Sequence, residues 1–323
     1  MNRYLRPLLA ALVALCLALA ASACGDDDDD DGGGDGGGAP ASEAIQSDPA
    51  NANTRITVGS KNFPEQFVLG EIYAQALEAA GFDVRKQLNI GSEVVAFKAL
   101  RQGEIDAYPE YTGTVLTALL NRKTEDLPKD PDVAYEQVVE GVADDNLTAF
   151  PRTPFENTYR LGLLKERAEE LGVTTTSDLA GEAADLTITG YPECRQRLDC
   201  LLGVERVYNL EFGDFVASES TYEVLDQGEA DVGFLFTTDA QLSTGDYTAL
   251  EDDERFFPPY NITLLMRNAK AEALGDAGRE MLERIQEPLT EEIMIELNSR
   301  VVIDKEKPED VAAEYLRAEG FIE

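Results

Sequence analysis

The stretch FKALRQGEID, residues 97–106, returns 125 positions later as YEVLDQGEAD, residues 222–231. Each copy has the pattern of a helix end, a glycine that can cap it, and an aspartate at the start of a strand. Continuing both copies without gaps places Tyr111 opposite Phe236. Each copy therefore delivers an aromatic side chain just past the carboxyl end of a predicted strand, where ligands bind in open α/β sheets. The repeat predicts two related lobes that present aromatic rings to one cleft.

The chain around the first copy alternates strands and helices. The β-branched segment at residues 55–60 predicts a strand, and Pro64 starts a helix whose apolar stripe ends before Gly81. Further strands are expected at 84–90 and 105–108, with a helix capped by Ser92 between them. Strand, helix, strand, helix and strand at this spacing predict an α/β fold with a parallel sheet.

The remaining chain divides at two points. A second lobe is expected to begin near residue 152, and the chain returns near residues 256–260. The segment after 271 has the pattern of helices that pack back on the first lobe. The expected organisation is therefore a first part of lobe 1 at 54–151, lobe 2 at 152–255, and a return to lobe 1 with C-terminal helices at 256–323.

The N-terminus predicts export. A basic head with two arginines precedes an apolar run at residues 8–20, which is too short to span a bilayer, and small residues follow it. Residues 1–23 are therefore predicted to be a signal peptide. Cys24, directly after Ala21-Ser22-Ala23, resembles the lipidated cysteine of bacterial lipoproteins, although Ala21 stands where leucine is usual. The alternative is plain secretion without a lipid.

The next segment, residues 24–53, predicts a disordered tether. It contains six consecutive aspartates at 26–31 and glycine-rich sequence to residue 38. Like charges repel each other and glycine has the largest entropy to lose on ordering, so this segment cannot pack a core. A spacer that holds the body off the membrane is favoured over a metal-binding aspartate run.

The formal net charge is −36, and removing the two arginines of the signal peptide makes it −38. Such a chain is repelled by nucleic acid and by anionic lipid headgroups. Ligands and partners are therefore expected to be neutral, zwitterionic or cationic.

The cysteines agree with an oxidising compartment. Cys194 and Cys200, six residues apart, are predicted to form a small disulfide loop, the alternative being a free buried pair. With no histidine in the chain, two cysteines argue against a structural zinc site, so no metal or other cofactor is expected.

Four separate blocks, in order, resemble the binding proteins of ABC importers for glycine betaine, choline and carnitine. They are GSKNFPEQ at 59–66, YPEYTGT at 108–114, NTY at 157–159 and FFPPYN at 256–261. The resemblance covers about residues 55–320. It implies a type II periplasmic-binding-protein fold, with two lobes of parallel or mixed sheets and a hinge. It also implies a monomer on the outer face of the cell membrane that delivers its ligand to permease subunits driven by a cytoplasmic ATPase.

The resemblance also implies the ligand-binding residues. The four aromatic residues that match a cage around a trimethylammonium group are Tyr111, Tyr159, Phe236 and Tyr260. Phe236 departs from the usual tyrosine and lacks its hydroxyl. Positions that hold a ligand carboxylate are matched by Lys61, Thr114 and Arg197, and the backbone around Asn157 matches one that touches the cation.

The chemistry agrees with this cage. A quaternary ammonium has no N–H to donate, so aromatic faces recognise it, at about 0.5–2 kcal/mol per ring. Lysine and arginine would hold a ligand carboxylate, arginine through its planar fork. The structural alternatives are ordinary ones: a core tyrosine, a solvated Lys61, or an Arg197 that pairs with a neighbouring acid. Removing Tyr111 or Tyr260 is expected to weaken ligand binding with little loss of stability.

Two other functions compete with this interpretation. An enzyme such as a cell-wall hydrolase is disfavoured, because a chain without histidine has no Ser-His-Asp or Cys-His arrangement and shows no phosphate-binding glycine loop. No catalytic residue is therefore expected. A receptor for an amino acid or a polyamine remains open, and a polyamine receptor would place acidic groups in the cleft.

Overall fold

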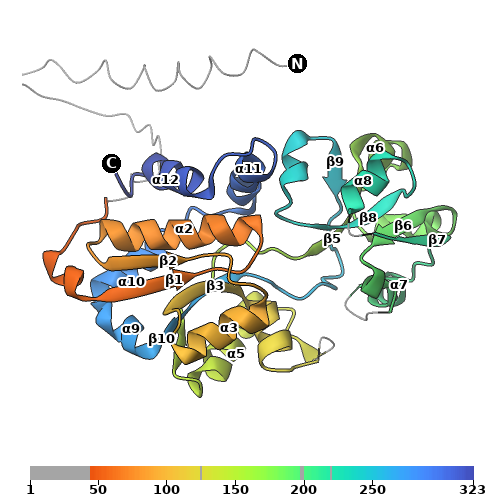
Figure 1. Ribbon diagram of the computed structural model, residues 1–323. Helices are drawn as coiled ribbons and strands as arrows, with labels where there is room; N and C mark the ends of the chain where they lie inside the picture. The colour runs from red at the N-terminus through yellow and green to blue at the C-terminus, as the bar shows by residue number, and fades with distance from the viewer. Residues whose placement is uncertain (1–43, 124–125, 197–199, 219) are drawn as a thin grey trace, which may run out of the picture. The chain divides into compact units, whose positions relative to one another are not determined.

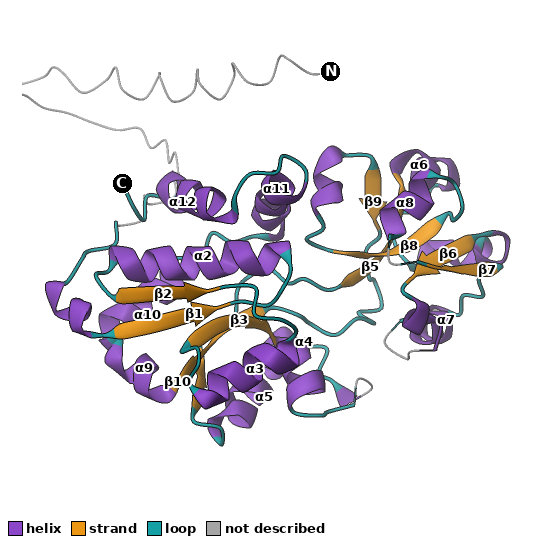
Figure 2. Ribbon diagram, in the orientation of Figure 1, coloured by secondary structure: helices purple, strands orange, loops and turns teal. Residues whose placement is uncertain are grey.

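Residues 44–323, except 124–125, 197–199 and 219, are described by the computed structural model drawn in Figures 1 and 2. All of them belong to one compact unit. The predicted signal peptide, Cys24 and Arg197 lie outside the described residues. Across the segments that the structure does describe, no helix has both the length and the apolar character needed to span a membrane.

The first of two five-stranded sheets has the strand order β2-β1-β3-β10-β4. Its strands are β1 (Arg55–Gly59), β2 (Asp83–Gln87), β3 (Ala107–Tyr111), β4 (Leu147–Ala149) and β10 (Ile262–Arg267). β1 pairs in parallel with β2 and β3, whereas β10 runs antiparallel to β3 and β4. The sheet is therefore mixed, and the last part of the chain supplies one of its central strands.

Helices cover both faces of this sheet, as Figure 2 shows. They are α2 (Pro64–Ala79), α3 (Glu93–Gln102), α4 (Thr112–Thr114), α5 (Pro131–Ala143), α9 (Asn268–Ala273), α10 (Gly275–Arg284), α11 (Glu291–Val302) and α12 (Pro308–Ala318). α2 is buried on nearly every side, because the sheet lies under it and α11 and α12 pack on it. The C-terminal helices α11 and α12 thus lie against the first sheet through α2.

The second sheet has the order β7-β6-β8-β5-β9. Its strands are β5 (Tyr159–Leu164), β6 (Thr187–Gly190), β7 (Asp214–Ala217), β8 (Val232–Phe236) and β9 (Tyr247–Ala249), and its helices are α6 (Lys165–Leu171), α7 (Leu201–Tyr208) and α8 (Thr221–Asp226). β6 pairs in parallel with β7 and β8, and β5 runs antiparallel to β8 and β9. The strand order and the strand directions match those of the first sheet, although β5, which takes the place of β10, comes first rather than last along its part of the chain.

The two copies of the sequence repeat occupy equivalent places in the two sheets. Gly103 caps α3 with a left-handed φ of 75°, and Gly228 follows α8 with a φ of 67°. Asp106 then accepts a hydrogen bond from the backbone N–H of Thr57 on β1, at 2.9 Å. Asp231 accepts the corresponding bond from Thr187 on β6, at 3.0 Å. The two aspartates expected at strand starts therefore have a structural role, since each fixes the start of a central strand.

Three observed boundaries differ from those expected from the sequence. β2 spans 83–87 rather than 84–90. β3 spans 107–111 rather than 105–108, because residues 104–106 form the turn that Asp106 anchors. Tyr111 and Phe236 are consequently the last residues of β3 and β8 rather than the residues just beyond them. Residues 44–53 also pack on the body, where Ile45 N–H donates to the carbonyl of Phe321 at 2.9 Å.

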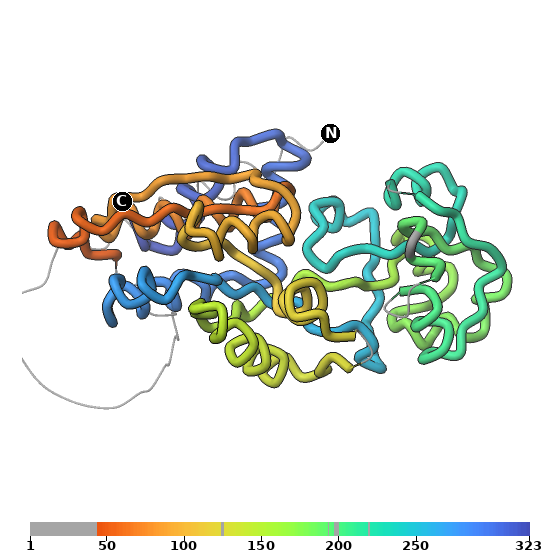
Figure 3. Tube along the Cα trace, turned by 60° about the horizontal axis from the view of Figure 1, so that its bottom comes forward, coloured from red at the N-terminus to blue at the C-terminus, as the bar shows by residue number. Residues whose placement is uncertain are grey.

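The chain passes between the two sheets in two segments, 150–158 and 250–261, which lie side by side (Figure 3). They are held together as an antiparallel pair by an isolated bridge between Glu156 and Asn261. Asn157 N–H donates to the carbonyl of Tyr260 at 3.1 Å, and Thr237 N–H donates to Thr158 at 2.9 Å. These crossing segments place Asn157 and Tyr260 between the ends of β3 and β8.

Candidate functional site

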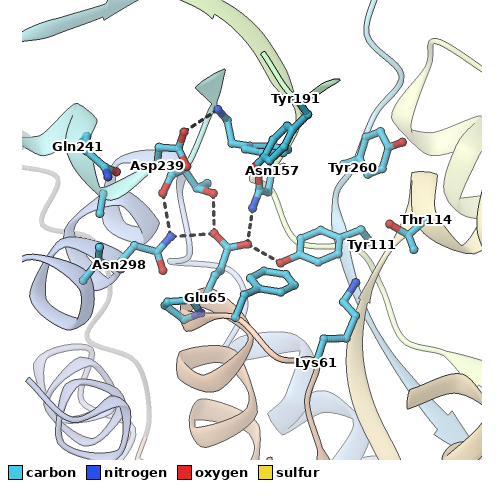
Figure 4. A pocket seen from close by; sticks show the side chains of 16 residues that line it. Lys61, Glu65, Tyr111, Thr114, Asn157, Tyr191, Asp239, Gln241, Tyr260 and Asn298 are labelled. Atoms are coloured by element: carbon cyan, nitrogen blue, oxygen red, sulfur yellow. Dashed lines mark hydrogen bonds between the residues drawn. The ribbon is translucent and has the colours of Figure 1, made fainter. Parts of the chain in front are cut away.

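A cavity of about 500 Å³ lies where the two sheets and the crossing segments meet. Figure 4 shows side chains from all of these elements pointing toward it. The lining residues are Lys61, Phe63, Pro64, Glu65, Tyr111, Thr114, Asn157, Tyr191, Phe236, Thr238, Asp239, Ala240, Gln241, Tyr260, Asn298 and Val302. The carboxyl ends of β3 and β8 both open onto it, as expected for a ligand site in α/β sheets.

Six of the eight residues predicted as ligand contacts line this cavity: Lys61, Tyr111, Thr114, Asn157, Phe236 and Tyr260. Tyr159 is outside the lining and stacks on Phe236, with ring centroids 4.5 Å apart. Arg197 lies outside the described residues. Most of the residues predicted from the sequence therefore line one cavity, although they are spread from Lys61 to Tyr260 along the chain.

The aromatic rings of the cavity are fixed by their neighbours. Phe63 stacks near Tyr111, with centroids 6.1 Å apart. The ring of Tyr260 lies against Gly113, where a Cβ atom would fall 2.6 Å from it. Only glycine leaves room for the ring at that position, because real Cβ contacts are not that short. The rings are therefore held in place before any ligand enters.

Lys61 forms a buried ion pair with Glu110. Both side chains are almost fully buried, and Glu110 also accepts hydrogen bonds from Tyr108 and from the backbone of Tyr111. The ammonium of Lys61 lies 4.3 Å from the centroid of the Tyr111 ring. The sequence analysis named Lys61 but not its partner. The charge of Lys61 is already balanced inside the protein, so it offers a ligand its remaining N–H groups rather than an unpaired charge.

Glu65 is the most highly connected side chain of the cavity, and the sequence analysis missed it. It lies in the first turn of α2 and is 3 % exposed. One carboxylate oxygen accepts from the hydroxyl of Tyr111 at 2.6 Å and from Nδ2 of Asn157 at 2.9 Å. The other accepts from Thr238 at 2.5 Å and from Nδ2 of Asn298 at 2.8 Å. A single carboxylate thus joins the first sheet, a crossing segment, the loop after β8 and α11.

The hydrogen-bond pattern identifies Glu65 as an acceptor. Amide N–H groups can only donate, and a flipped amide would set a carbonyl oxygen against the carboxylate. Burial and then the adjacent Glu65 carboxylate raise the pKa of Tyr111 well above its ordinary value, so this hydroxyl keeps its proton and donates it. The signal that could have identified Glu65 is its position in the same GSKNFPEQ block as Lys61.

Asp239 is a second carboxylate in the wall, and it was also missed. It accepts hydrogen bonds from the backbone of Phe236 and from the hydroxyl of Tyr222, both at 2.8 Å. Burial raises the pKa of Asp239 to about 6, because a charge is disfavoured away from water, and Glu65 adds to the effect. Counting 125 positions from Thr114 would have found it.

Tyr191 is the third residue that the sequence analysis missed. It follows β6 and lines both the main cavity and an adjoining one of about 400 Å³. Cys194 N–H donates to its carbonyl at 2.9 Å, and Cys194 is joined to Cys200 by a disulfide with Cα atoms 5.1 Å apart. The disulfide loop therefore begins at the edge of the cavity.

The arrangement suits the binding of a small molecule and lacks the parts of a metal centre. Among the residues that the structure describes, no group of three or more His, Cys, Asp or Glu side chains could hold a metal ion. The cavity combines aromatic faces, one paired lysine and two carboxylates between two topologically matching sheets. Fold and site together define a two-lobed solute-binding protein.

The comparisons with known proteins agree with this class. The family model described as "Substrate binding domain of ABC-type glycine betaine transport system" matches residues 54–318. The chain belongs to this family. It is therefore a solute-binding protein of ABC transport systems that works outside the cytoplasm, and it is not an enzyme.

Relatives match most of this chain. A glycine-betaine-binding protein of Pseudomonas aeruginosa is 31 % identical over 287 residues, which cover 85 % of this chain and 90 % of that protein. An ergothioneine transport permease/binding protein of Helicobacter pylori is 28 % identical over 270 residues, or 82 % of this chain, but the chain spans only 48 % of its length.

A solved structure titled as a glycine betaine/carnitine/choline ABC transporter superposes with a TM-score of 0.74. It is 25 % identical and covers 82 % of this chain and 98 % of its own. This confirms the predicted binding-protein fold with two lobes of mixed sheets.

Proposed function

We propose that this protein binds a quaternary-ammonium osmoprotectant, such as glycine betaine or choline, in the cavity between its two sheets and delivers it to the permease subunits of an ABC importer. The observation that carries the proposal is the set of aromatic rings, Tyr111, Phe236 and Tyr260, that converge on this cavity from three separate segments. A trimethylammonium group offers no hydrogen bond and is recognised by such rings.

The neighbours of these rings support a cage. Tyr159 backs Phe236 from the next strand and is tilted against Phe257 at 5.9 Å, so it shapes the cage from behind. Asn157 contributes its backbone between the two sheets. The aromatic residues therefore form a wall that continues from one sheet to the other.

A ligand carboxylate would lie at the end of the cavity that holds Lys61 and Thr114. Lys61 has three N–H donors, of which Glu110 takes one. Arg197, assigned to this role by its match to the family pattern, would supply a planar cation. Arg197→Ala should therefore weaken glycine betaine binding and leave choline binding nearly unchanged, because choline has no carboxylate.

A calorimetric titration of the purified protein with glycine betaine, proline betaine, choline and carnitine tests the proposal. Binding of at least one of them is expected, with loss of affinity in Tyr260→Ala. A protein that binds none of the four ligands contradicts the proposal.

We also propose that the mature chain is anchored to the outer face of the membrane through lipidated Cys24, with residues 25–43 as part of the tether. Cys24→Ala should release the protein into the medium, because acyl chains supply the attachment. Fractionation and mass spectrometry of the mature N-terminus measure this, and a wild-type protein that is soluble and carries no lipid contradicts it.

One observation favours a second candidate, a receptor for a polyamine or another primary amine. Glu65 and Asp239 place two carboxylates in the cavity wall, which is the acidic lining such a receptor requires. Including putrescine and spermidine in the same titration separates the two functions.

A further inference from the structure

Glu65 presents a negative charge to the cavity without free hydrogen-bonding capacity. An ionised carboxylate has about four acceptor positions on its two oxygens. Tyr111, Asn157, Thr238 and Asn298 donate one hydrogen bond each, two to either oxygen. The acceptor positions are therefore filled by the protein, whereas the charge is not neutralised by these four donors, all of which are neutral.

The charges around Glu65 leave it as the electrostatic centre of the cavity. Lys61, the one cation among the lining residues that the structure describes, pairs with Glu110. Asp239, the next carboxylate, adds negative charge when it is ionised. Figure 4 shows Glu65 between Tyr111 on one side and Asp239 and Asn298 on the other. A cation among the rings thus lies beside an uncompensated carboxylate.

A saturated carboxylate distinguishes between two kinds of cation. A primary ammonium left without acceptors for its N–H groups forfeits hydrogen bonds that it makes in water. A quaternary ammonium has no N–H group and needs only a nearby negative charge and an apolar surface. Glu65 therefore offers electrostatic attraction without hydrogen-bond acceptors, which favours a quaternary ammonium over a primary one.

We propose that Glu65 is the counter-ion of the bound quaternary ammonium and that its four donors make it selective against primary ammonium ions. The inference rests on the proposed function and assigns a residue and a charge preference to the same site. It also argues against the polyamine receptor, since the acidic lining is already hydrogen-bonded.

The test compares ligands that carry a quaternary nitrogen with isosteres that have an uncharged carbon in its place. The pairs are choline with 3,3-dimethylbutan-1-ol, and glycine betaine with 3,3-dimethylbutanoate. Calorimetric or competition titration gives the ratio of the two dissociation constants within a pair. Glu65→Gln should lower the preference for the member with the quaternary nitrogen about tenfold, because it removes a buried negative charge a few ångströms from that nitrogen.

Glu71→Gln is the matched control. Glu71 is a buried carboxylate on the same helix, paired with Lys86 at 2.9 Å, and it is not among the residues that line the cavity. Its substitution should leave the ratio unchanged. A purely structural role for Glu65 would weaken both members of a pair equally, so an unchanged ratio in Glu65→Gln overturns the inference. A wild-type protein that binds no quaternary ammonium instead overturns the proposed function.

Thr238→Val keeps the inference testable if Glu65→Gln does not fold. This change removes one donor and frees one acceptor position on a carboxylate that keeps its charge. The preference for choline over its isostere should persist, while the affinity for ethanolamine relative to choline should rise several-fold. No change in the ethanolamine ratio would contradict saturation of the carboxylate.

Discussion

The two sheets repeat one backbone design and fill it with different chemistry. In the first sheet an aspartate before β3 accepts a backbone N–H from β1, and in the second an aspartate before β8 accepts one from β6. Both β3 and β8 end in an aromatic residue beside an antiparallel neighbour. The lobes differ in what surrounds that aromatic residue. Tyr111 is 4 % exposed and hydrogen-bonded to Glu65, whereas Phe236 has no hydroxyl and is half-buried.

The same contrast extends to the neighbouring positions. Lys61 lies four residues after Thr57, and Tyr191 lies four residues after Thr187, so a cation in one sheet corresponds to an aromatic ring in the other. The buried Glu110 corresponds to the buried Leu235. The backbone contacts that fix the strands are shared, while the residues that face the cavity are not. The first sheet and α2 supply the Lys61–Glu110 pair and Glu65, whereas the second sheet supplies two aromatic rings and Asp239.

Replacing the two equivalent aromatic residues should have unequal effects on stability. Tyr111→Ala removes a residue of the first core and should lower the free energy of unfolding by about 3–5 kcal/mol. Its burial revises the expectation that this change would spare the fold. Phe236→Ala, at a half-buried site, should cost less than half as much, although both should weaken ligand binding. Chemical denaturation followed by circular dichroism measures the difference, and equal losses would contradict it.

Asp239 should give the second sheet a pH dependence that its counterpart Thr114 cannot give the first. Its pKa is about 6 in the folded protein and near 3.8 in the unfolded chain, so the folded state holds the proton more tightly. Stability from this group is present at low pH and is lost as pH rises from about 4 to 6.

The measurement is a difference between two proteins, because 63 acidic residues contribute their own titrations. The free energy of unfolding of Asp239→Asn minus that of wild type should increase between pH 4 and pH 7, by at most about 3 kcal/mol. A difference that is flat over this range, or that falls, shows that Asp239 is not held protonated by the fold.

The two anchoring aspartates should also differ in strength. Asp106 is 6 % exposed and lies near two cations, Arg267 at 3.2 Å and Lys270 at 3.7 Å. Asp231 is more exposed and pairs with Arg167 at 3.1 Å. Asp106→Ala should therefore destabilise by about 2–3 kcal/mol and Asp231→Ala by about 1 kcal/mol. Thermal and denaturant unfolding of the pair checks the order.

The smallest effect is expected when Phe236 is made to match its counterpart. Phe236→Tyr adds a hydroxyl at a half-buried position that faces the cavity, so stability should change by no more than about 0.5 kcal/mol. Ligand affinity should be retained, because the aromatic face is kept. A large loss of affinity in calorimetry would mean that the apolar edge of Phe236, and not its face, contacts the ligand.

The sequence was sufficient for the scaffold and for six of the sixteen residues that line the cavity. The repeat could be recognised from Gly103, Gly228 and the two aspartates, because the backbone conformation at these positions limits which residues fit. Glu65 was not predicted because its role depends on partners from other segments. Tyr191 and Asp239 differ in residue type from their counterparts Lys61 and Thr114, so the likeness in residue type between the two repeats does not point to them. A glutamate at the start of a helix is ordinary locally, and its four donors lie 46 to 233 residues away. The role of Glu110 could not be predicted for the same reason, since nothing in the sequence of its strand indicates that it pairs with Lys61.

The paired crossing segments make the second-sheet region suitable for exchange between related proteins. All five strands of the second sheet lie between Tyr159 and Ala249, and the chain enters and leaves this region through two segments bonded to each other at Glu156 and Asn261. The whole region is thus an insertion with adjacent ends, of the kind that can be transplanted as a cassette. A relative's insertion spliced at these two points would bring its own equivalents of Tyr191, Phe236 and Asp239 to an unchanged Glu65. Ligand preference could then be rebuilt one half at a time.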